Sequence, residues 1–185
     1  MTGRLAEFAM GVDACHDAVA GPVSTVGAPC GIAVASWQRL PGEPLRGVDA
    51  LSWHAAPASD ERTLAEFAPR LVRLQWNTVR AELDDVLDHL TQRTSKGAPL
   101  LEHELVRGAI ADVALALSEA ASLLDLPPAG ARLWRVHLRL VSAGRTLLRL
   151  FGASGFLTDG PGGVLYLTEL MGNVYLHPET EDSRD

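Results

Sequence analysis

The chain has 185 residues, 47% of them hydrophobic, which is enough for one domain with a sizeable core. Its net charge of −7 argues against nucleic acid or an anionic membrane as the main partner, because both require a basic surface. The sequence shows no charged-then-apolar leader and no apolar run of about 18 residues, so we expect a soluble, cytoplasmic protein. Cys15 and Cys30 belong to no CxxC pattern and are expected to be free thiols.

The first 58 residues predict a helix followed by a small hairpin. Apolar side chains recur at steps of three and four over residues 5–19, and Gly21-Pro22 ends that pattern. Two short β-like runs follow, at residues 31–37 and 48–54. A Pro- and Gly-containing turn at residues 41–44 separates them, which favours a hairpin.

From Ser59 onward the pattern is helical. A first long helix is expected from the apolar stripe that ends at Leu90, with Pro69 either in its first turn or at a kink. A second helix is predicted over about residues 100–126; it is apolar on more than one face, so it should be the buried one. Further helices are expected over residues 129–151 and 164–176.

Together these segments predict a mainly α fold. We expect an up-and-down four-helix-type bundle over residues 59–185, with a small N-terminal helix and hairpin extension over residues 1–58. The acidic tail that starts at His177 is expected to fray.

Two glycine-containing turns, each at the end of a predicted helix, carry a more specific signal. The first reads RTSKGAPL over residues 93–100, and the second reads RLFGASGF over residues 149–156. In order and spacing they resemble two motifs of the C-terminal helical domain of the acyl-CoA dehydrogenases, Arg-x-Gln-Phe-Gly-x-Pro-Leu and Gln-x-x-Gly-Gly-x-Gly-Tyr. The resemblance covers about residues 60–176.

The resemblance implies a flavin site that is completed by other subunits. In that family both turns lie against a flavin, the second at its pyrophosphate, and glycines there let backbone N–H groups approach phosphate oxygens. The cofactor implied is FAD, held only within a complex, and the partner implied is a second copy or a flavin-bearing acyl-CoA dehydrogenase subunit. The corresponding cofactor-binding residues of this chain are Arg93, Gly97, Arg149, Gly152 and Gly155.

The catalytic parts of the family are not evident. The position of the short- and medium-chain catalytic glutamate falls near Leu176, which cannot take a proton, and no other catalytic residue is assigned. The family's Arg-Asp pair after the Tyr is replaced by Leu167-Thr168. The N-terminal helical domain and most of the β-domain have no counterpart in the sequence.

Three functions therefore stay open. The first is a truncated acyl-CoA dehydrogenase-like subunit that helps form a flavin and acyl-thioester site for α,β-dehydrogenation. The second is a cofactor-free bundle that binds, isomerises or cyclises a hydrophobic intermediate of secondary metabolism. The third is a structural interaction bundle.

Other chemical signals are weak. Glu102-His103-Glu104 lacks the ligand spacing of a metal site, and no metal is expected. Gly152 and Gly155 also fit a helix C-cap and a tight turn. Five arginines on one side of the third helix are either an anion-facing stripe or a solvated face paired with carboxylates of the first long helix. These arginines are Arg132, Arg135, Arg139, Arg145 and Arg149, and the carboxylates are Glu82, Asp84, Asp85 and Asp88.

Overall fold

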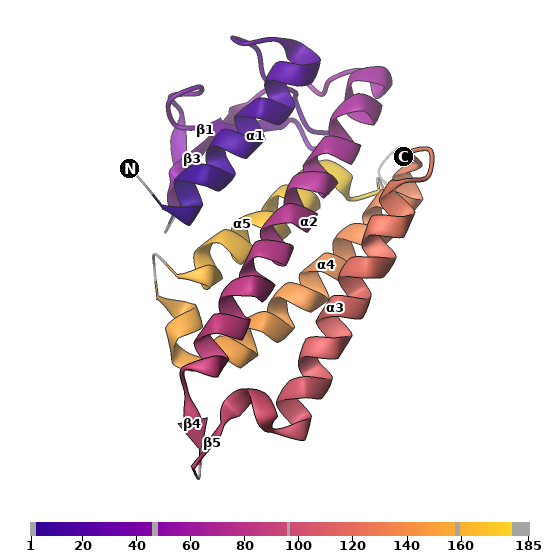
Figure 1. The fold of residues 1–185 in the computed structure, drawn as a ribbon. Helices are drawn as coiled ribbons and strands as arrows, with labels where there is room; N and C mark the ends of the chain where they lie inside the picture. The colour runs from indigo at the N-terminus through magenta and orange to yellow at the C-terminus, as the bar shows by residue number, and fades with distance from the viewer. Residues whose placement is uncertain (1–2, 46–47, 96, 158–159, 179–185) are drawn as a thin grey trace, which may run out of the picture.

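Four long helices form the body of the molecule. A computed structural model describes residues 3–45, 48–95, 97–157 and 160–178. The helices are α2 (Glu61–Thr91), α3 (Glu104–Leu124), α4 (Gly130–Phe151) and α5 (Pro161–Leu176), and they alternate in direction along the chain (Figure 1). The predicted mainly α, up-and-down bundle is therefore confirmed.

The N-terminal segment lies against one side of this bundle. Helix α1 (Arg4–Ala20) packs on α2 and α5, whereas α3 lies on the opposite side of the molecule (Figure 1). The hydrophobic core is continuous across the boundary expected at residues 58 and 59, because Phe8 and Val12 of α1 belong to the same buried cluster as Phe67 of α2.

A three-stranded antiparallel sheet accompanies α1. Strands β1 (Ile32–Ser36) and β3 (Val48–Ala55) pair as the sequence predicts, with Ile32 opposite Ala55. Part of the expected turn is itself a short strand, β2 (Glu43–Leu45), which pairs with the other edge of β3. The order β1-β3-β2 leaves β1 at an edge of the sheet, facing the helices.

Helix α2 is the central helix of the bundle. Asp60 caps its N-terminus by accepting a 2.9 Å hydrogen bond from the Thr63 N–H, the arrangement typical of helix starts. Pro69 lies inside the helix, two turns after this cap, so the helix does not begin there. Its buried side chains are the most numerous of any helix within the described residues: Phe67, Leu71, Val72, Gln75, Val79, Glu82, Leu83, Val86 and Leu90.

The expectation that the second bundle helix would be the buried one is wrong. A short 3-10 turn, η1 (Leu100–Glu102), precedes α3, and only Val113, Leu117 and Ala120 of α3 are buried. Leu105 is 90% exposed and Leu115 is 61% exposed. The sequence shows that α3 is apolar on more than one face, but it does not show which face has a neighbour. Here α3 packs on α2 and α4 and leaves an apolar outer face in solvent.

The turns that follow α2 and α4 lie at the same end of the bundle (Figure 1). Strands β4 (Thr94–Ser95) and β5 (Ala98–Pro99) form a two-residue ladder after α2. The 3-10 helix η2 (Gly152–Phe156) follows α4. None of the helices within the described ranges has the length and apolar character that crossing a bilayer requires.

Candidate functional site

An apolar pocket with a volume of about 440 Å³ lies between α4 and α5. The two helices approach closely here because Gly144 faces Leu165: a Cβ on Gly144 would lie 3.1 Å from Leu165 Cδ2. The pocket lining is mostly apolar, with Leu140, Val141, Leu148, Phe156, Leu157, Leu165 and Tyr166 among its members. A pocket of this size and character is typical of a small-molecule site.

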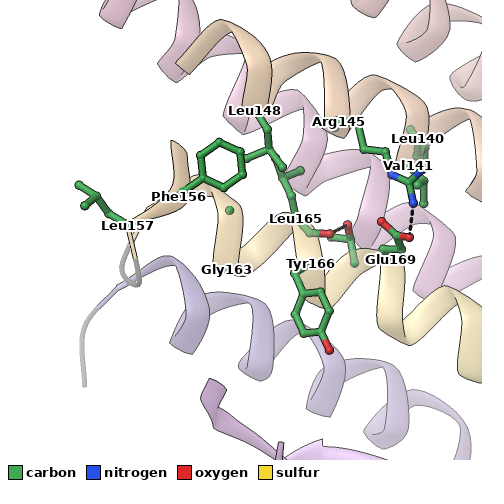
Figure 2. Close-up of a pocket in the computed structure, with 13 residues that line it drawn as sticks. Leu140, Val141, Arg145, Leu148, Phe156, Leu157, Gly163, Leu165, Tyr166 and Glu169 are labelled. Atoms are coloured by element: carbon green, nitrogen blue, oxygen red, sulfur yellow. Dashed lines mark hydrogen bonds and ion pairs between the residues drawn. The ribbon is translucent and has the colours of Figure 1, made fainter. Parts of the chain in front are cut away.

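One end of this pocket is apolar and the other is charged. Figure 2 shows Leu148 and Phe156 at the first end, next to the turn after α4. At the second end the Arg145 guanidinium donates a 2.6 Å hydrogen bond to Glu169. Phe156 is 74% exposed and Leu157 is 64% exposed, so the mouth of the pocket presents apolar side chains to solvent.

A second, polar pocket of about 350 Å³ continues along the same two helices. It shares Val141, Arg145 and Glu169 with the apolar pocket. Its other lining residues are His137, Leu138, Ser142, Arg149 and Asn173. We call the two pockets together the α4–α5 groove.

His137 is the buried titratable side chain at the polar end of the groove. Its Nδ1 lies 3.2 Å from Gln75 Oε1, and Gln75 in turn donates a 2.8 Å hydrogen bond from its amide nitrogen to the Thr168 carbonyl. This bond turns the Gln75 oxygen toward His137, so each ring nitrogen faces an amide oxygen, Gln75 Oε1 at Nδ1 and Asn173 Oδ1 at Nε2. Burial lowers the pKa of His137, and its Nε2 lies 3.3 Å from Asn173 Oδ1.

Gly172 of α5 makes room for this imidazole. A Cβ at position 172 would lie 2.1 Å from the His137 ring, which no ordinary contact allows. This arrangement could not be predicted from the sequence, because neither a lone His nor a single Gly inside a helix has a distinctive spacing. Gln75 and Thr168 contribute through contacts that only the fold creates.

The residues expected to bind a cofactor all lie at or near the end of the bundle where α2 and α4 finish. Arg93 contacts His89, 3.2 Å away, and the His89 ring packs on Phe151 at a centroid distance of 5.5 Å. Gly97 is exposed with φ +85°, and Arg149 lies in the polar pocket with its guanidinium on Thr146 Oγ1. The phosphate-binding role of Arg93, Gly97 and Arg149 stays a prediction.

The two remaining glycines have clear packing roles. Gly152 ends α4 with φ +63°, and its N–H bonds to carbonyls of the last turn. Gly155 is buried, and a Cβ there would lie 3.0 Å from Phe151 Cβ. Its carbonyl oxygen would lie 2.4 Å from a Cβ on Gly162. These positions fit the cap and tight-turn interpretation, and the phosphate-binding role of Gly152 and Gly155 stays a prediction.

The arginines of α4 pair with other carboxylates than those expected. Arg145 pairs with Glu169 and Arg139 with Glu119, whereas Glu82 and Asp85 both pair with Arg4 of α1. Pairing between α4 and α2 is expected from the sequence, which does not show that Arg4 of α1 pairs with Glu82 and Asp85 of α2.

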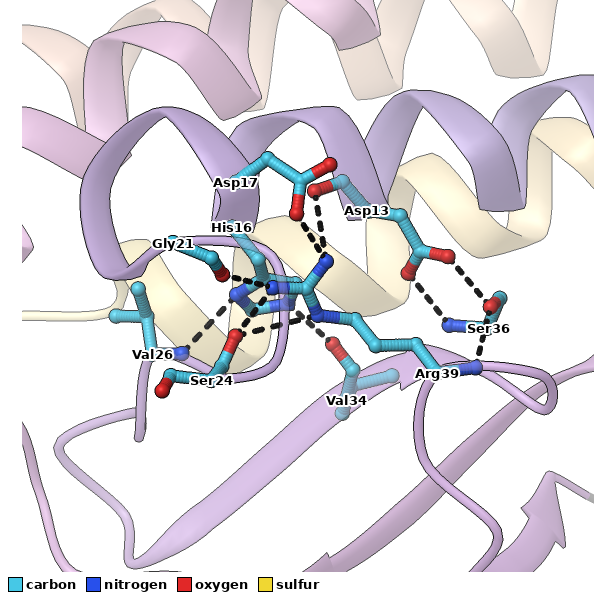
Figure 3. Close-up of polar contacts among 9 residues, drawn as sticks. All are labelled: Asp13, His16, Asp17, Gly21, Ser24, Val26, Val34, Ser36 and Arg39. Atoms are coloured by element: carbon cyan, nitrogen blue, oxygen red, sulfur yellow. Dashed lines mark hydrogen bonds and ion pairs between the residues drawn. The ribbon is translucent and has the colours of Figure 1, made fainter.

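A second polar cluster, around His16, is structural. The sheet edge formed by β1 would leave backbone groups unpaired, and side chains satisfy them (Figure 3). His16 donates from Nε2 to the Val34 carbonyl and accepts at Nδ1 from the Val26 N–H. The Tyr175 hydroxyl accepts from the Val34 N–H and donates to the Val26 carbonyl, both at 3.0 Å.

Arg39 and Asp13 extend this cluster toward the surface. Asp13 accepts from the Ser36 N–H and hydroxyl, and Arg39 pairs with Asp17 at 2.5 Å (Figure 3). Burial lowers the pKa of His16, so its ring is neutral and fully committed to two hydrogen bonds. We assign this cluster to fold stability.

Within the described residues no group of three His, Cys, Asp or Glu side chains could hold a metal ion. Leu176 is buried at the end of α5 and lines a smaller apolar pocket of about 270 Å³ at the other end of the bundle.

Comparison with known proteins supports the fold and leaves the activity open. No family model and no curated protein matches this chain. Among solved structures, butyryl-CoA dehydrogenase from Megasphaera elsdenii matches with a TM-score of 0.56 and 15% sequence identity over 80% of this chain. The chain has an acyl-CoA dehydrogenase-like fold.

The match covers most of this chain but less than half of the butyryl-CoA dehydrogenase chain. The chain covers 45% of the length of the butyryl-CoA dehydrogenase chain, less than half of that protein. Residues 59–185 make up about two thirds of the present chain, so a match over 80% of it includes part of residues 1–58. The likeness is therefore not confined to the four-helix bundle.

Proposed function

We propose that this chain binds a hydrophobic, acyl-type ligand in the α4–α5 groove. The observation that carries this proposal is the apolar pocket of about 440 Å³ between Leu140, Leu148 and Leu165, which is large enough for a medium-length acyl chain. The acyl-CoA dehydrogenase-like fold supports the ligand class, since the structural neighbour is a butyryl-CoA dehydrogenase.

In this proposal the chain is a subunit that works with a flavin-bearing partner on acyl-thioesters. FAD, when held by that partner, supplies the oxidising power for α,β-dehydrogenation. The chain's own glycines at 152 and 155 are engaged in capping and packing, so they do not hold the cofactor alone. Arg93 and Arg149, both exposed near the same end of the bundle, offer positive charge to a phosphate that the partner brings.

Ligand binding is tested by filling the pocket. Val141 lines both halves of the groove, so Val141→Trp should abolish or strongly weaken binding of decanol or a decanoyl thioester in calorimetry. Ala81→Trp is the matched control, because Ala81 is exposed on α2 outside the groove. Equal binding by Val141→Trp and the wild type, or no binding of any acyl probe to the wild type, would reject the proposal.

A second candidate function is binding, or conversion, of a hydrophobic intermediate without a cofactor. It is favoured by His137, a buried titratable side chain that lines the polar pocket next to the apolar one. A flavin absorbance spectrum in protein purified with a co-expressed acyl-CoA dehydrogenase subunit would support the first function. Tight ligand binding by colourless protein that forms no complex would support the second.

A further inference from the structure

The polar end of the groove has the composition of an anion-binding site. Arg149 contacts Thr146 Oγ1 and, within the described part of the chain, forms no ion pair. A guanidinium carries five N–H donors, so most of those of Arg149 are available to a ligand. Ser142 and Asn173, which line the same pocket, add neutral donors.

The charge balance at this end is positive. Glu169 also lines the pocket, but Arg145 pairs with it at 2.6 Å and compensates its charge. Arg149 is then a positive charge in the polar pocket that has no carboxylate partner among the described residues. Guanidinium groups bind carboxylates with two parallel hydrogen bonds, which makes this end selective for a planar oxyanion.

The two pockets are parts of one groove, so one ligand can occupy both. Val141, Arg145 and Glu169 line both of them, so the apolar and the polar pocket meet along these three side chains. We propose that the groove binds a medium-chain carboxylic acid, with the alkyl chain in the apolar pocket and the carboxylate at Arg149. This proposal rests on the proposed function, that the groove takes an acyl chain.

The test compares two probes that differ only in the head group. Decanoate and decanol, both below the concentration at which decanoate forms micelles, are titrated into the protein by calorimetry. Decanoate should bind about tenfold more tightly than decanol, the ratio expected when a ligand charge gains one good hydrogen-bonded partner.

Two variants test whether Arg149 is responsible for the preference for decanoate over decanol. Arg149→Gln should reduce the affinity for decanoate about tenfold and leave the affinity for decanol unchanged. Arg135→Gln is the matched control: Arg135 is exposed on the same helix, contacts only the Ala131 carbonyl and lines neither pocket, so both affinities should stay as in the wild type.

The outcomes separate the two proposals. Equal binding of decanoate and decanol, or an Arg149→Gln variant that weakens both alike, overturns the carboxylate site while the acyl-binding function stands. Failure of both probes to bind overturns both. Loss of the preference in Arg135→Gln as well as in Arg149→Gln shows a general surface-charge effect and also overturns the carboxylate site.

Discussion

At the scale of single residues, buried polar side chains define how the N-terminal segment attaches to the bundle. Tyr175 of α5 and His16 of α1 together satisfy the N–H and carbonyl groups of Val26 and Val34. Tyr175 therefore connects α5, and His16 connects α1, to the edge of β1 at Val34, whose backbone groups would otherwise have no partner.

Tyr175→Phe should destabilise the protein by about 1–3 kcal/mol, because it leaves the buried Val34 N–H without an acceptor. The ring itself, which packs on Phe67 at a centroid distance of 4.8 Å, is kept in this variant. Chemical denaturation measures the change. Tyr166→Phe is the control, since Tyr166 is 51% exposed, and a loss as large as that of Tyr175→Phe would contradict the explanation.

Glu82 should make the protein less stable as the pH rises. Burial raises the pKa of Glu82 to about 7, despite the Arg4 guanidinium 3.0 Å away. The folded state therefore holds a proton that the unfolded state releases at lower pH. The free energy of unfolding should fall by roughly 2–3 kcal/mol through this group between about pH 4.5 and pH 7.

Glu82→Gln removes this titration while keeping a hydrogen-bonding side chain next to Arg4. The variant should be less sensitive to pH than the wild type between about pH 5 and pH 8, and more stable at the upper end. Urea unfolding at several pH values provides the comparison. The lowered pKa values of His16 and His137 act in the opposite direction on acidification, but they are common to both proteins and cancel in the difference.

At the scale of elements, the sequence predicted where helices lie better than how they face one another. The patterns over residues 5–19, 129–151 and 164–176 correspond closely to α1, α4 and α5, because apolar spacing and the Gly and Pro stops are local properties. The exposed face of α3 and the α4–α5 groove depend on which helices become neighbours, and no local pattern records that.

Two helical glycines, Gly172 on α5 and Gly108 on α3, should respond to substitution by alanine in opposite ways. Gly172→Ala should cost about 1–3 kcal/mol, because the new Cβ would meet the His137 ring. Gly108→Ala on α3 should instead stabilise by about 0.5–1 kcal/mol, since nothing lies within 4 Å and Ala favours the helix.

Thermal or chemical unfolding of the two single variants tests this contrast. A stabilised Gly172→Ala protein would show that the His137 pocket adapts easily and that the Gln75–His137 contact is not a fixed feature of the groove. In that case the groove could not be treated as preformed.

At the scale of the whole molecule, the exposed apolar side chains bear on how the protein could assemble. Exposed apolar side chains occur on the outer face of α3, with Leu105 and Leu115 the clearest, and again at the mouth of the groove. Monomeric proteins rarely leave such side chains in one region without a role. We propose that the outer face of α3 contacts a second copy or a partner subunit.

Light scattering should therefore give a mass above the 19.7 kDa of one chain, either alone or with a co-expressed partner. Leu115→Glu should shift the protein toward the monomer, because it places a charge on that face. A strictly monomeric wild-type protein that captures no partner would contradict the proposal.

The sequence could indicate the fold family but not the site. The two glycine turns at residues 93–100 and 149–156 lie near one bundle end in space. Gly155, however, is a packing residue, and the groove residues His137, Gln75 and Asn173 are spread over three helices with no shared motif. Such a constellation exists only after folding.

The contact between Gly155 and Gly162 offers a practical filter for recognising relatives. Backbone meets backbone there, so any chain that turns from α4 into α5 in the same way must lack a side chain at position 162. Exposed positions around this turn carry no such restriction on residue type. A glycine seven positions after another, directly following a Pro at the start of a helix, is therefore a criterion for selecting distant sequences whose overall identity is too low for ordinary matching.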